Sequence, residues 1–236
     1  MDSLIRLNKY ISNSGVCSRR HADVLIKDGK IKVNGKVITE LGTKISPSDK
    51  VEFGNKLLSP EKLVYVLLNK PKDHITTLDD PQVRKTVMHL VRNATKERIY
   101  PVGRLDRNTT GLLLFTNDGE LAKKLSHPSY QIQKIYLIET DKNISETDLT
   151  KILQGVDLED GKALIDSVNY VEGNKREIAI ELHIGKNRII RRIFEHLGYE
   201  IIRLDRVVYA GLNKIGITRG KWRFLKPLEI VNLKKL

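Results

Sequence analysis

The apolar residues at the start of the chain recur every three or four positions, which is the spacing of an amphipathic helix. The residues that set this spacing are Leu4, Leu7, Tyr10 and Ile11. We expect Ser14-Gly15 to end this helix and Ser18 to cap a second one, over residues 19–27, through its side-chain oxygen. The pattern therefore predicts that the chain opens with two short helices.

After these helices the apolar spacing changes to the alternation that is typical of strands. Ile31 and Val33 alternate with lysines, and Asn34-Gly35 follows, a dipeptide that strongly favours a two-residue hairpin turn. Further short strands are expected at 37–38 and 51–53, whereas residues 54–62 show no periodicity. We therefore predict a small domain over residues 1–56 and a linker over 57–63.

A fully apolar run at residues 63–68 predicts a buried strand at the start of a second domain, residues 64–236. Other strands are expected at 112–116, 134–140, 163–171, 177–184, 201–208 and 228–233, and helices at 86–90, 120–126, 146–154 and 188–197. Strands outnumber helices and do not alternate with them regularly. This order predicts an α+β fold with a mixed or antiparallel sheet rather than a doubly wound one.

Composition narrows the class of protein. The 236 residues contain a single cysteine, Cys17, which excludes a disulfide framework and a cysteine-based metal site. The six histidines are scattered and suggest no zinc spacing, so no metal is expected. No apolar run is long enough to cross a membrane, and the first residues lack the layout of a signal peptide. We therefore expect a cytoplasmic protein with no membrane partner.

The net charge of +13 is concentrated in two parts of the chain. Residues 1–60 carry 11 basic and 6 acidic side chains, and residues 185–236 carry 13 and 4. Between these two regions the chain is nearly neutral. Two separate basic regions favour a long polyanion as the partner, whereas a generally cationic surface is the simpler alternative.

The most unusual segment is residues 100–116, where a polar loop between Gly103 and Gly111 precedes an apolar strand. Asp106 lies in this loop between Arg104 and Arg107. An aspartate in a loop is most often a turn former that bonds its own backbone. The flanking arginines would also keep it ionised, and loops at the edge of a rigid sheet often carry reactive groups. Asp106 is therefore a candidate catalytic carboxylate.

The sequences at 6–11, 18–22 and 29–35 give residues 4–53 a resemblance to the alpha-L RNA-binding module, which is named after a small-subunit ribosomal protein. This resemblance implies that Arg6, Lys9, Arg19 and Arg20 face RNA phosphates. The alternative for these four residues is an ordinary solvated helix face.

The sequence Gly-Arg-Leu-Asp at 103–106, followed by residues 108–121, resembles the signature of RNA pseudouridine synthases, in particular the ribosomal branch whose members are called RsuA and RluB. Further motifs follow the same order at 69–71, 134–136, 185–192 and 203–207, so the resemblance covers nearly all of the chain. It implies isomerisation of a uridine within RNA, with Asp106 as the catalytic residue and no cofactor. Asp106 could attack the sugar or remove a proton from it, and the sequence does not distinguish these roles.

The resemblance also assigns other residues. Tyr136 would stack on the target base and relay a proton, Arg191 would pair with Asp106, and Arg104 would hold the flipped base out of its helix. The basic residues expected to contact RNA near this site are Lys186, Arg188 and Arg192. Two positions depart from the family pattern: Asp73 stands where a glycine is frequent, and Ile189 where a polar residue is frequent.

Three alternatives remain open at this point. A non-catalytic RNA-binding or ribosome-assembly factor could use the same two domains, although it would not need Asp106, Tyr136 and Arg191 together. A DNA-binding protein is less consistent with the Asn34-Gly35 hairpin. Three segments resemble the enzymes that act on the large ribosomal subunit: 117–122, 158–161 and 219–222. Large-subunit ribosomal RNA is therefore the expected substrate, ahead of small-subunit RNA. We expect the protein to be a monomer.

Overall fold

The computed structural model describes residues 4–236, and the chain divides into two compact units, Met1–Leu63 and Val64–Leu236. The first unit begins with helices α1 (Leu7–Asn13) and α2 (Arg19–Lys27), which pack against each other. The Ser18 hydroxyl accepts a hydrogen bond from the backbone N–H of His21, which confirms the predicted cap. Both helices therefore form where the sequence indicates, although Leu4 lies outside the first one.

The sheet of the first unit has the strand order β3-β2-β5-β6. Its strands are β2 (Ile31–Val33), β3 (Lys36–Ile38), β5 (Val51–Phe53) and β6 (Lys56–Leu57), and a separate pair joins β1 (Ile5–Arg6) to β4 (Lys44–Ile45). Asn34 and Gly35 both have positive φ, 51° and 80°, as the predicted two-residue hairpin turn requires.

The segment that we expected to be a linker is part of the first unit. Leu58 is buried in its core, and the backbone N–H of Leu58 donates to the carbonyl of Val51 at 2.8 Å. The N–H of Glu61 donates to the carbonyl of Asn13 at 2.8 Å. The expected linker over 57–63 is therefore wrong at its beginning, because a single buried leucine in an irregular segment produces no periodicity.

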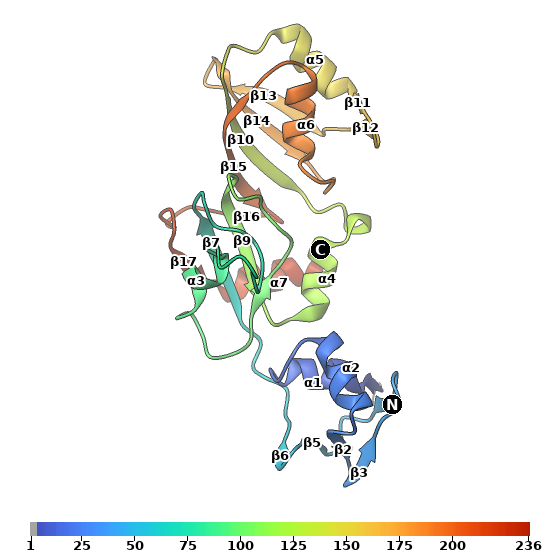
Figure 1. The fold of residues 1–236 in the computed structure, drawn as a ribbon. Coiled ribbons are helices and arrows are strands. Elements are labelled where there is room, and N and C mark those ends of the chain that lie inside the picture. Colours follow the sequence, from blue (N-terminus) through green and yellow to red (C-terminus); the bar gives the residue numbers. More distant parts are fainter. Residues whose placement is uncertain (1–3) are drawn as a thin grey trace. The chain divides into compact units, whose positions relative to one another are not determined.

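The second unit is built on one mixed sheet with the strand order β13-β14-β10-β15-β9-β7-β17 (Figure 1). These strands are β7 (Tyr65–Lys70), β9 (Thr110–Thr116), β10 (Lys134–Thr140), β13 (Ser167–Val171), β14 (Asn174–Leu182), β15 (Ile201–Tyr209) and β17 (Trp222–Phe224), with β8 (Tyr100–Pro101) beside β9 and β16 (Leu212–Asn213) beside β15. Strands β15 and β9 run parallel, and the other neighbours run antiparallel. The α+β class and the mixed sheet are confirmed.

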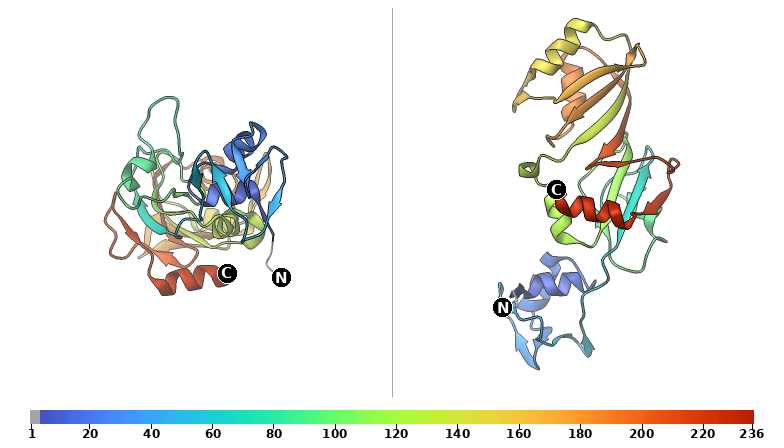
Figure 2. Two further views of the ribbon diagram at one scale, coloured as in Figure 1. Left: turned by 90° about the horizontal axis from the view of Figure 1, so that it is seen from below. Right: turned by 180° about the vertical axis from the view of Figure 1, so that it is seen from behind.

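Helices cover both faces of this sheet. Helices α3 (Val87–Val91), α5 (Glu146–Gln154) and α6 (Ile189–His196) contribute to one apolar core, and α4 (Gly119–Ser126) and α7 (Pro227–Lys235) contribute to the other. Strand β7 alternates between the two, with Val66 and Leu68 in the first core and Leu67 in the second. The central strands are therefore buried throughout. Figure 2 shows α7 beside α4, where Lys124 Nζ donates to the carbonyl of Lys234.

The strand predicted at 228–233 is wrong, because these residues belong to α7. Pro227 occupies the first helical position, and the Glu229 carboxylate accepts a hydrogen bond from the backbone N–H of Lys226 at 2.7 Å. These are helix-start signals that the short apolar run conceals. The single strand predicted at 163–171 is divided between β12 (Gly161–Ala163), which forms a hairpin with β11 (Val156–Leu158), and β13. No helix within residues 4–236 has the length and apolar character that a membrane crossing needs.

Candidate active site

Four of the residues with predicted chemistry line one cavity of about 200 Å³ in the second unit: Asp106, Tyr136, Arg191 and Arg104. Asp106 and Arg104 lie on the loop between β8 and β9, Tyr136 lies on β10, and Arg191 lies on α6. Residues separated by up to 87 positions in the sequence therefore meet at one site. Six lysine or arginine side chains but only one carboxylate, that of Asp106, line this cavity. Such a cavity suits an anionic ligand.

Lys70, the last residue of β7, holds the loop that carries Asp106. Its side chain is fully buried, and its ammonium group donates to the carbonyls of Pro71, Asp106, Arg107 and Thr109 at 2.8–3.2 Å. Burial lowers the pKa of Lys70 to about 8, while the negative charges of Asp106 and Asp73 oppose this shift. The loop is thus fixed through its main chain, independently of its side chains.

Two further residues attach the same loop to the segment that follows β7. The Thr76 hydroxyl donates to the carbonyl of Leu105 at 2.7 Å and accepts from its N–H at 3.2 Å. The Asp73 N–H donates to the carbonyl of Arg107, and the Arg107 Nε donates to the Asp73 carboxylate, both at 3.0 Å. Asp73 has φ of 63°, in the left-handed region that favours glycine, the residue that the family resemblance led us to expect here. Here the aspartate adopts that conformation and adds an ion pair to the loop.

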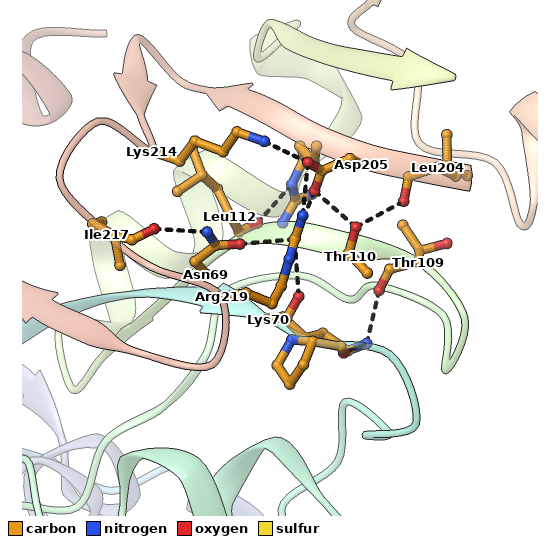
Figure 3. Close-up of polar contacts among 12 residues, drawn as sticks. Asn69, Lys70, Thr109, Thr110, Leu112, Leu204, Asp205, Lys214, Ile217 and Arg219 are labelled. Atoms are coloured by element: carbon orange, nitrogen blue, oxygen red, sulfur yellow. Dashed lines mark hydrogen bonds and ion pairs between the residues drawn. The ribbon is translucent and has the colours of Figure 1, made fainter. Parts of the chain in front are cut away.

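A buried charge network fixes the strands behind the loop (Figure 3). The Asp205 carboxylate on β15 accepts hydrogen bonds from Thr110 Oγ1 at 2.8 Å, from Arg219 at 2.8 and 3.0 Å, and from Lys214. Burial acts to raise the pKa of Asp205, but these donors outweigh it and hold the pKa at about 2. Arg219 also donates to the side chain of Asn69 on β7. The end of β7 and the start of β9 are therefore both anchored to β15.

Gly111 permits the close approach of β9 to β15. Its φ is 105°, and a Cβ at this position would lie 2.6 Å from the backbone nitrogen of Arg206 and closer still to the Arg206 carbonyl oxygen. A side chain at residue 111 would therefore require movement of one of the two parallel strands. This contact sets the position of the loop relative to β15.

Tyr136 is buried on β10, directly opposite Arg206 on β15. Arg206 and a second cation, Lys134, line the same cavity. Lys134 donates to the carbonyls of Ile132 and His183 at 2.8 and 2.9 Å, and burial, assisted by the charge of Arg206, lowers the pKa of Lys134 to about 8. Tyr136 therefore shares this cavity with two buried or partly buried cations, Arg206 and Lys134.

Arg191 shares the cavity with Asp106 but makes no ion pair with it within 4 Å among residues 4–236. Its Nη1 instead donates to the carbonyl of Ile201 at 3.3 Å. Burial and the neighbouring Arg188 lower the pKa of Arg191, whereas the charge of Asp106 raises it. The two side chains are thus coupled electrostatically across the cavity.

The predicted RNA-binding residues have different environments. Lys186 and Arg188 line the rim of the cavity, but Arg192 pairs with the Asp160 carboxylate, and Lys186 donates to the Asp160 carbonyl at 2.8 Å. In the first unit Arg6, Arg19 and Arg20 are exposed and Lys9 is half-buried. The hairpin β11–β12 therefore binds Arg192 and Lys186, two of the residues that we expected to contact RNA.

Sequence analysis gave no individual role to Lys70, Lys134 or Arg206, although all three fall in the motifs it identified. The sequence feature that could have indicated the role of Lys70 is its place at the end of a mostly apolar strand. Among residues 4–236 no group of three or more His, Cys, Asp or Glu side chains is arranged to hold a metal ion.

Comparison with known proteins identifies the family of this chain. Residues 64–196 match the family described as RNA pseudouridylate synthase, and residues 5–51 match the S4 domain. The chain belongs to the RNA pseudouridine synthase family, in its RsuA-type branch.

Individual relatives support this assignment over the full length. The chain is 44% identical over 235 residues to ribosomal large subunit pseudouridine synthase B of Bacillus subtilis, covering 98% of this chain and 96% of the relative. It is 37% identical over 242 residues to the dual-specificity RNA pseudouridine synthase RluF of Escherichia coli, covering 100% and 80%. A crystal structure of a pseudouridylate synthase superposes with a TM-score of 0.69 at 25% identity, covering 97% and 99%. The chain is therefore an RNA pseudouridine synthase, an isomerase.

Proposed function

We propose that this enzyme converts a specific uridine of ribosomal RNA, of the large subunit, to pseudouridine, with Asp106 as the catalytic carboxylate. The observation that carries this proposal is the meeting of Asp106, Tyr136 and Arg191 in one cationic cavity. The names of the relatives support ribosomal RNA as the substrate, and the Bacillus subtilis relative supports the large subunit. We propose further that the protein acts as a monomer in the cytoplasm.

The roles follow from the chemistry of each group. The Asp106 carboxylate attacks the anomeric carbon of the target nucleotide or removes a proton from its sugar, and both reactions need its ionised form. Arg191 and the other cations of the cavity place positive charge around that carboxylate and attract the anionic RNA. The ring of Tyr136 stacks on the base, and its hydroxyl relays a proton. Arg104, exposed at the rim, fills the space that the flipped base leaves.

The remaining basic residues bind the RNA backbone. In the first unit these are Arg6, Lys9, Arg19 and Arg20, at the cavity they are Lys186 and Arg188, and on α6 the residue is Arg192. Phosphate contacts of this kind supply affinity without reading the sequence, so the choice of uridine depends on the shape of the RNA and on the cavity.

The test is a map of the pseudouridines in ribosomal RNA from cells with and without the protein. We expect one or a few sites in large-subunit RNA to disappear, and to return with the wild-type protein but not with Asp106→Asn. Asp157→Asn is the matched control, because Asp157 is exposed on β11 and lies outside the cavity. This control is expected to restore the modification fully.

Each other outcome contradicts part of the proposal. Loss of a site in small-subunit RNA would move the substrate to that subunit. Restoration of the site by Asp106→Asn would remove Asp106 from catalysis. An unchanged map in both subunits would favour a ribosome-assembly factor instead.

A further inference from the structure

Arg206 contributes a buried hydrogen-bond donor that has no acceptor. The side chain is 3% exposed and lines the cavity that contains Asp106, and its Nη2 has no partner among residues 4–236. An unsatisfied donor of a charged group is costly in a protein interior unless a ligand satisfies it. Arg206 thus brings to the wall of the cavity one donor that no group of the described residues satisfies.

The rest of the Arg206 side chain is held rigidly. Its Nε donates to the carbonyl of Leu112 at 2.8 Å, and its guanidinium carbon lies 4.4 Å from the centre of the Tyr209 ring. The hydroxyl of Tyr209 in turn donates to the carbonyl of Leu125. The guanidinium is therefore held in place by contacts that leave Nη2 without an acceptor.

A second buried polar group without a partner lines the same cavity. The Thr109 hydroxyl ends the Asp106 loop, its residue is 3% exposed, and its Oγ1 makes no hydrogen bond among residues 4–236. Gly111, two residues later, lies directly opposite Arg206 in the parallel register of β9 and β15. Two unsatisfied polar groups, one on β15 and one at the end of the loop before β9, favour a polar ligand in this part of the cavity.

A nucleobase fits this place better than a phosphate. Arg206 and Tyr136 are direct neighbours across β10 and β15, both less than 10% exposed, whereas the exposed cations Arg104 and Arg188 lie at the rim. The base is the leading end of a flipped nucleotide, so it reaches the buried residues, while the phosphates stay with the RNA backbone near the rim.

We propose that Arg206 donates through Nη2 to a carbonyl oxygen of the target uracil, and that the Thr109 hydroxyl binds the same polar edge. This inference rests on the proposed function, because it assigns a part of that substrate to a place in the cavity.

A donor at this position serves both halves of the isomerisation. The N1–C1′ bond breaks with its electron pair on the base, and the negative charge spreads over N1, O2 and O4. The base then turns by half a revolution about the axis through N3 and C6, which exchanges N1 with C5 and O2 with O4. C5 gives an electron pair to C1′, loses its proton, and N1 gains a proton. Arg206 therefore meets a carbonyl oxygen of the base both before and after the turn. In the interval it stabilises the negative charge on the detached base.

A binding experiment tests the site without requiring turnover. The ¹⁵N-labelled guanidinium signals of the full-length protein are recorded with uridine and, separately, with inorganic phosphate, and Arg206→Lys assigns the Arg206 signals. We expect uridine to shift the Arg206 Nη signals and phosphate to leave them unchanged. The signals of Arg203, on the same strand and paired with Glu139 and Glu177, are the internal control. A response to phosphate alone, or no response to uridine, would overturn the proposal.

Kinetics on an unmodified large-subunit ribosomal RNA transcript provide the second test. We expect Arg206→Lys to lower the maximal single-turnover rate by about 100-fold, with the half-saturating RNA concentration changed less than about 3-fold. Arg203→Lys is expected to act like the wild type. A folded Arg206→Lys protein with a normal rate, or with a defect only in RNA binding, would contradict the assignment.

Thr109→Val provides a variant that should not disturb folding, since the hydroxyl it removes makes no hydrogen bond within the protein. Its melting temperature is expected to equal or exceed that of the wild type, and its maximal rate to fall by about 10-fold. An unchanged rate would remove Thr109 from the site. If the wild type modifies neither ribosomal RNA, the proposed function fails, and the uridine titration still decides the role of Arg206.

Discussion

Asp106 owes its position to residues that form no part of its own loop. Lys70 binds the carbonyls of the loop, Thr76 binds Leu105, and Asp205 anchors Thr110 at the start of β9. Each of these contacts is a hydrogen bond that joins the loop, or the strand that follows it, to another part of the chain. Accurate placement of a reactive carboxylate depends on such support, because small displacements cost large factors in rate.

Substitution of Gly111 tests whether β9 and β15 need a glycine to approach each other closely. We expect Gly111→Ala to lower the free energy of unfolding by about 3 kcal/mol, since the new methyl group meets the backbone of Arg206 and φ is positive. Gly103→Ala is the matched control, because Gly103 also has positive φ but open space around it, and its cost is about 1 kcal/mol. Urea unfolding measures both, and equal effects would refute the steric argument.

The pH dependence of stability tests the Asp205 network. The folded-state pKa of about 2 lies below the ordinary value of 3.8, so Asp205 stabilises the fold above pH 4, and this contribution is lost as pH falls toward 2. We expect Asp205→Asn to be destabilised by about 3 kcal/mol at pH 7, and the difference from wild type to shrink between pH 4 and 2. Chemical unfolding across this range measures it. A difference independent of pH would show that the carboxylate charge is not the stabilising feature.

At the residue scale the sequence predicts chemistry better than it predicts partners. Family resemblance predicted the roles of Asp106, Tyr136 and Arg191, and the structure brings all three to one cavity. The partner of Arg192 was not predictable, because Asp160 is distant in sequence and meets it only after β11 and β12 fold against α6. The unsatisfied Nη2 of Arg206 is likewise a property of packing alone.

At the scale of elements, the hairpin β11–β12 binds the N-terminal end of α6 through an ion pair. Asp160, in the turn of this hairpin, holds Arg192 of α6 and Lys186 of the preceding segment. The hydrogen bonds of Arg192 lower the pKa of Asp160, so this carboxylate is charged near neutral pH. In the proposed function, the acidic hairpin therefore competes with RNA for Lys186 and Arg192.

Removal of that competitor should strengthen RNA binding. We expect Asp160→Ala to bind an unmodified large-subunit ribosomal RNA transcript roughly 3-fold more tightly, with a steeper salt dependence. Glu159→Ala removes the same charge from the same hairpin without releasing Arg192, and it should have a smaller effect. Filter binding at several salt concentrations compares the two, and equal gains would mean that only net charge matters.

Elements with capping signals were the easiest to predict from sequence. The helix over residues 19–27 and the helix Glu146–Gln154 form where predicted, and in both a serine side chain caps the first turn. Residues 228–233 were predicted as a strand because four apolar residues in six fit either structure. The helix forms there because Pro227 and Glu229 begin it and because only Leu233 must be buried.

At the scale of the whole molecule, each of the two units has its own apolar core. The first unit is small, so it depends on every large apolar residue that it buries. Leu58 belongs to this core although it comes after the last strand predicted from the sequence. The smallest fragment that retains the whole core therefore extends to residue 63 rather than to residue 56.

This boundary can be tested with two adjacent leucines. In a fragment of residues 1–63 we expect Leu58→Ala to cost about 3 kcal/mol, since Leu58 is 3% exposed. Leu57→Ala should cost less than about 0.5 kcal/mol, since Leu57 is 57% exposed. Thermal unfolding followed by circular dichroism measures both. Equal losses of stability in the two variants would indicate that residues 57–63 are a linker after all.

The two basic regions predict how RNA affinity responds to salt. If Arg20 contacts a phosphate, Arg20→Gln lowers the slope of log affinity against log salt by about 1. Arg84→Gln is the control, since Arg84 is bound to Asp80 and lies outside the proposed RNA-binding residues. An unchanged slope for Arg20→Gln would leave this residue on a solvated helix face.

Lys70 has a consequence for how this enzyme can change. The loop keeps its shape because the Lys70 ammonium group binds three of its main-chain carbonyls, and every amino acid supplies such a carbonyl. The exposed side chains at Arg104 and Asn108 can therefore be exchanged while Asp106 stays in place. Of these two positions Asn108 has no role in the proposed reaction, so a library randomised there is a practical starting point for changing the choice of RNA target.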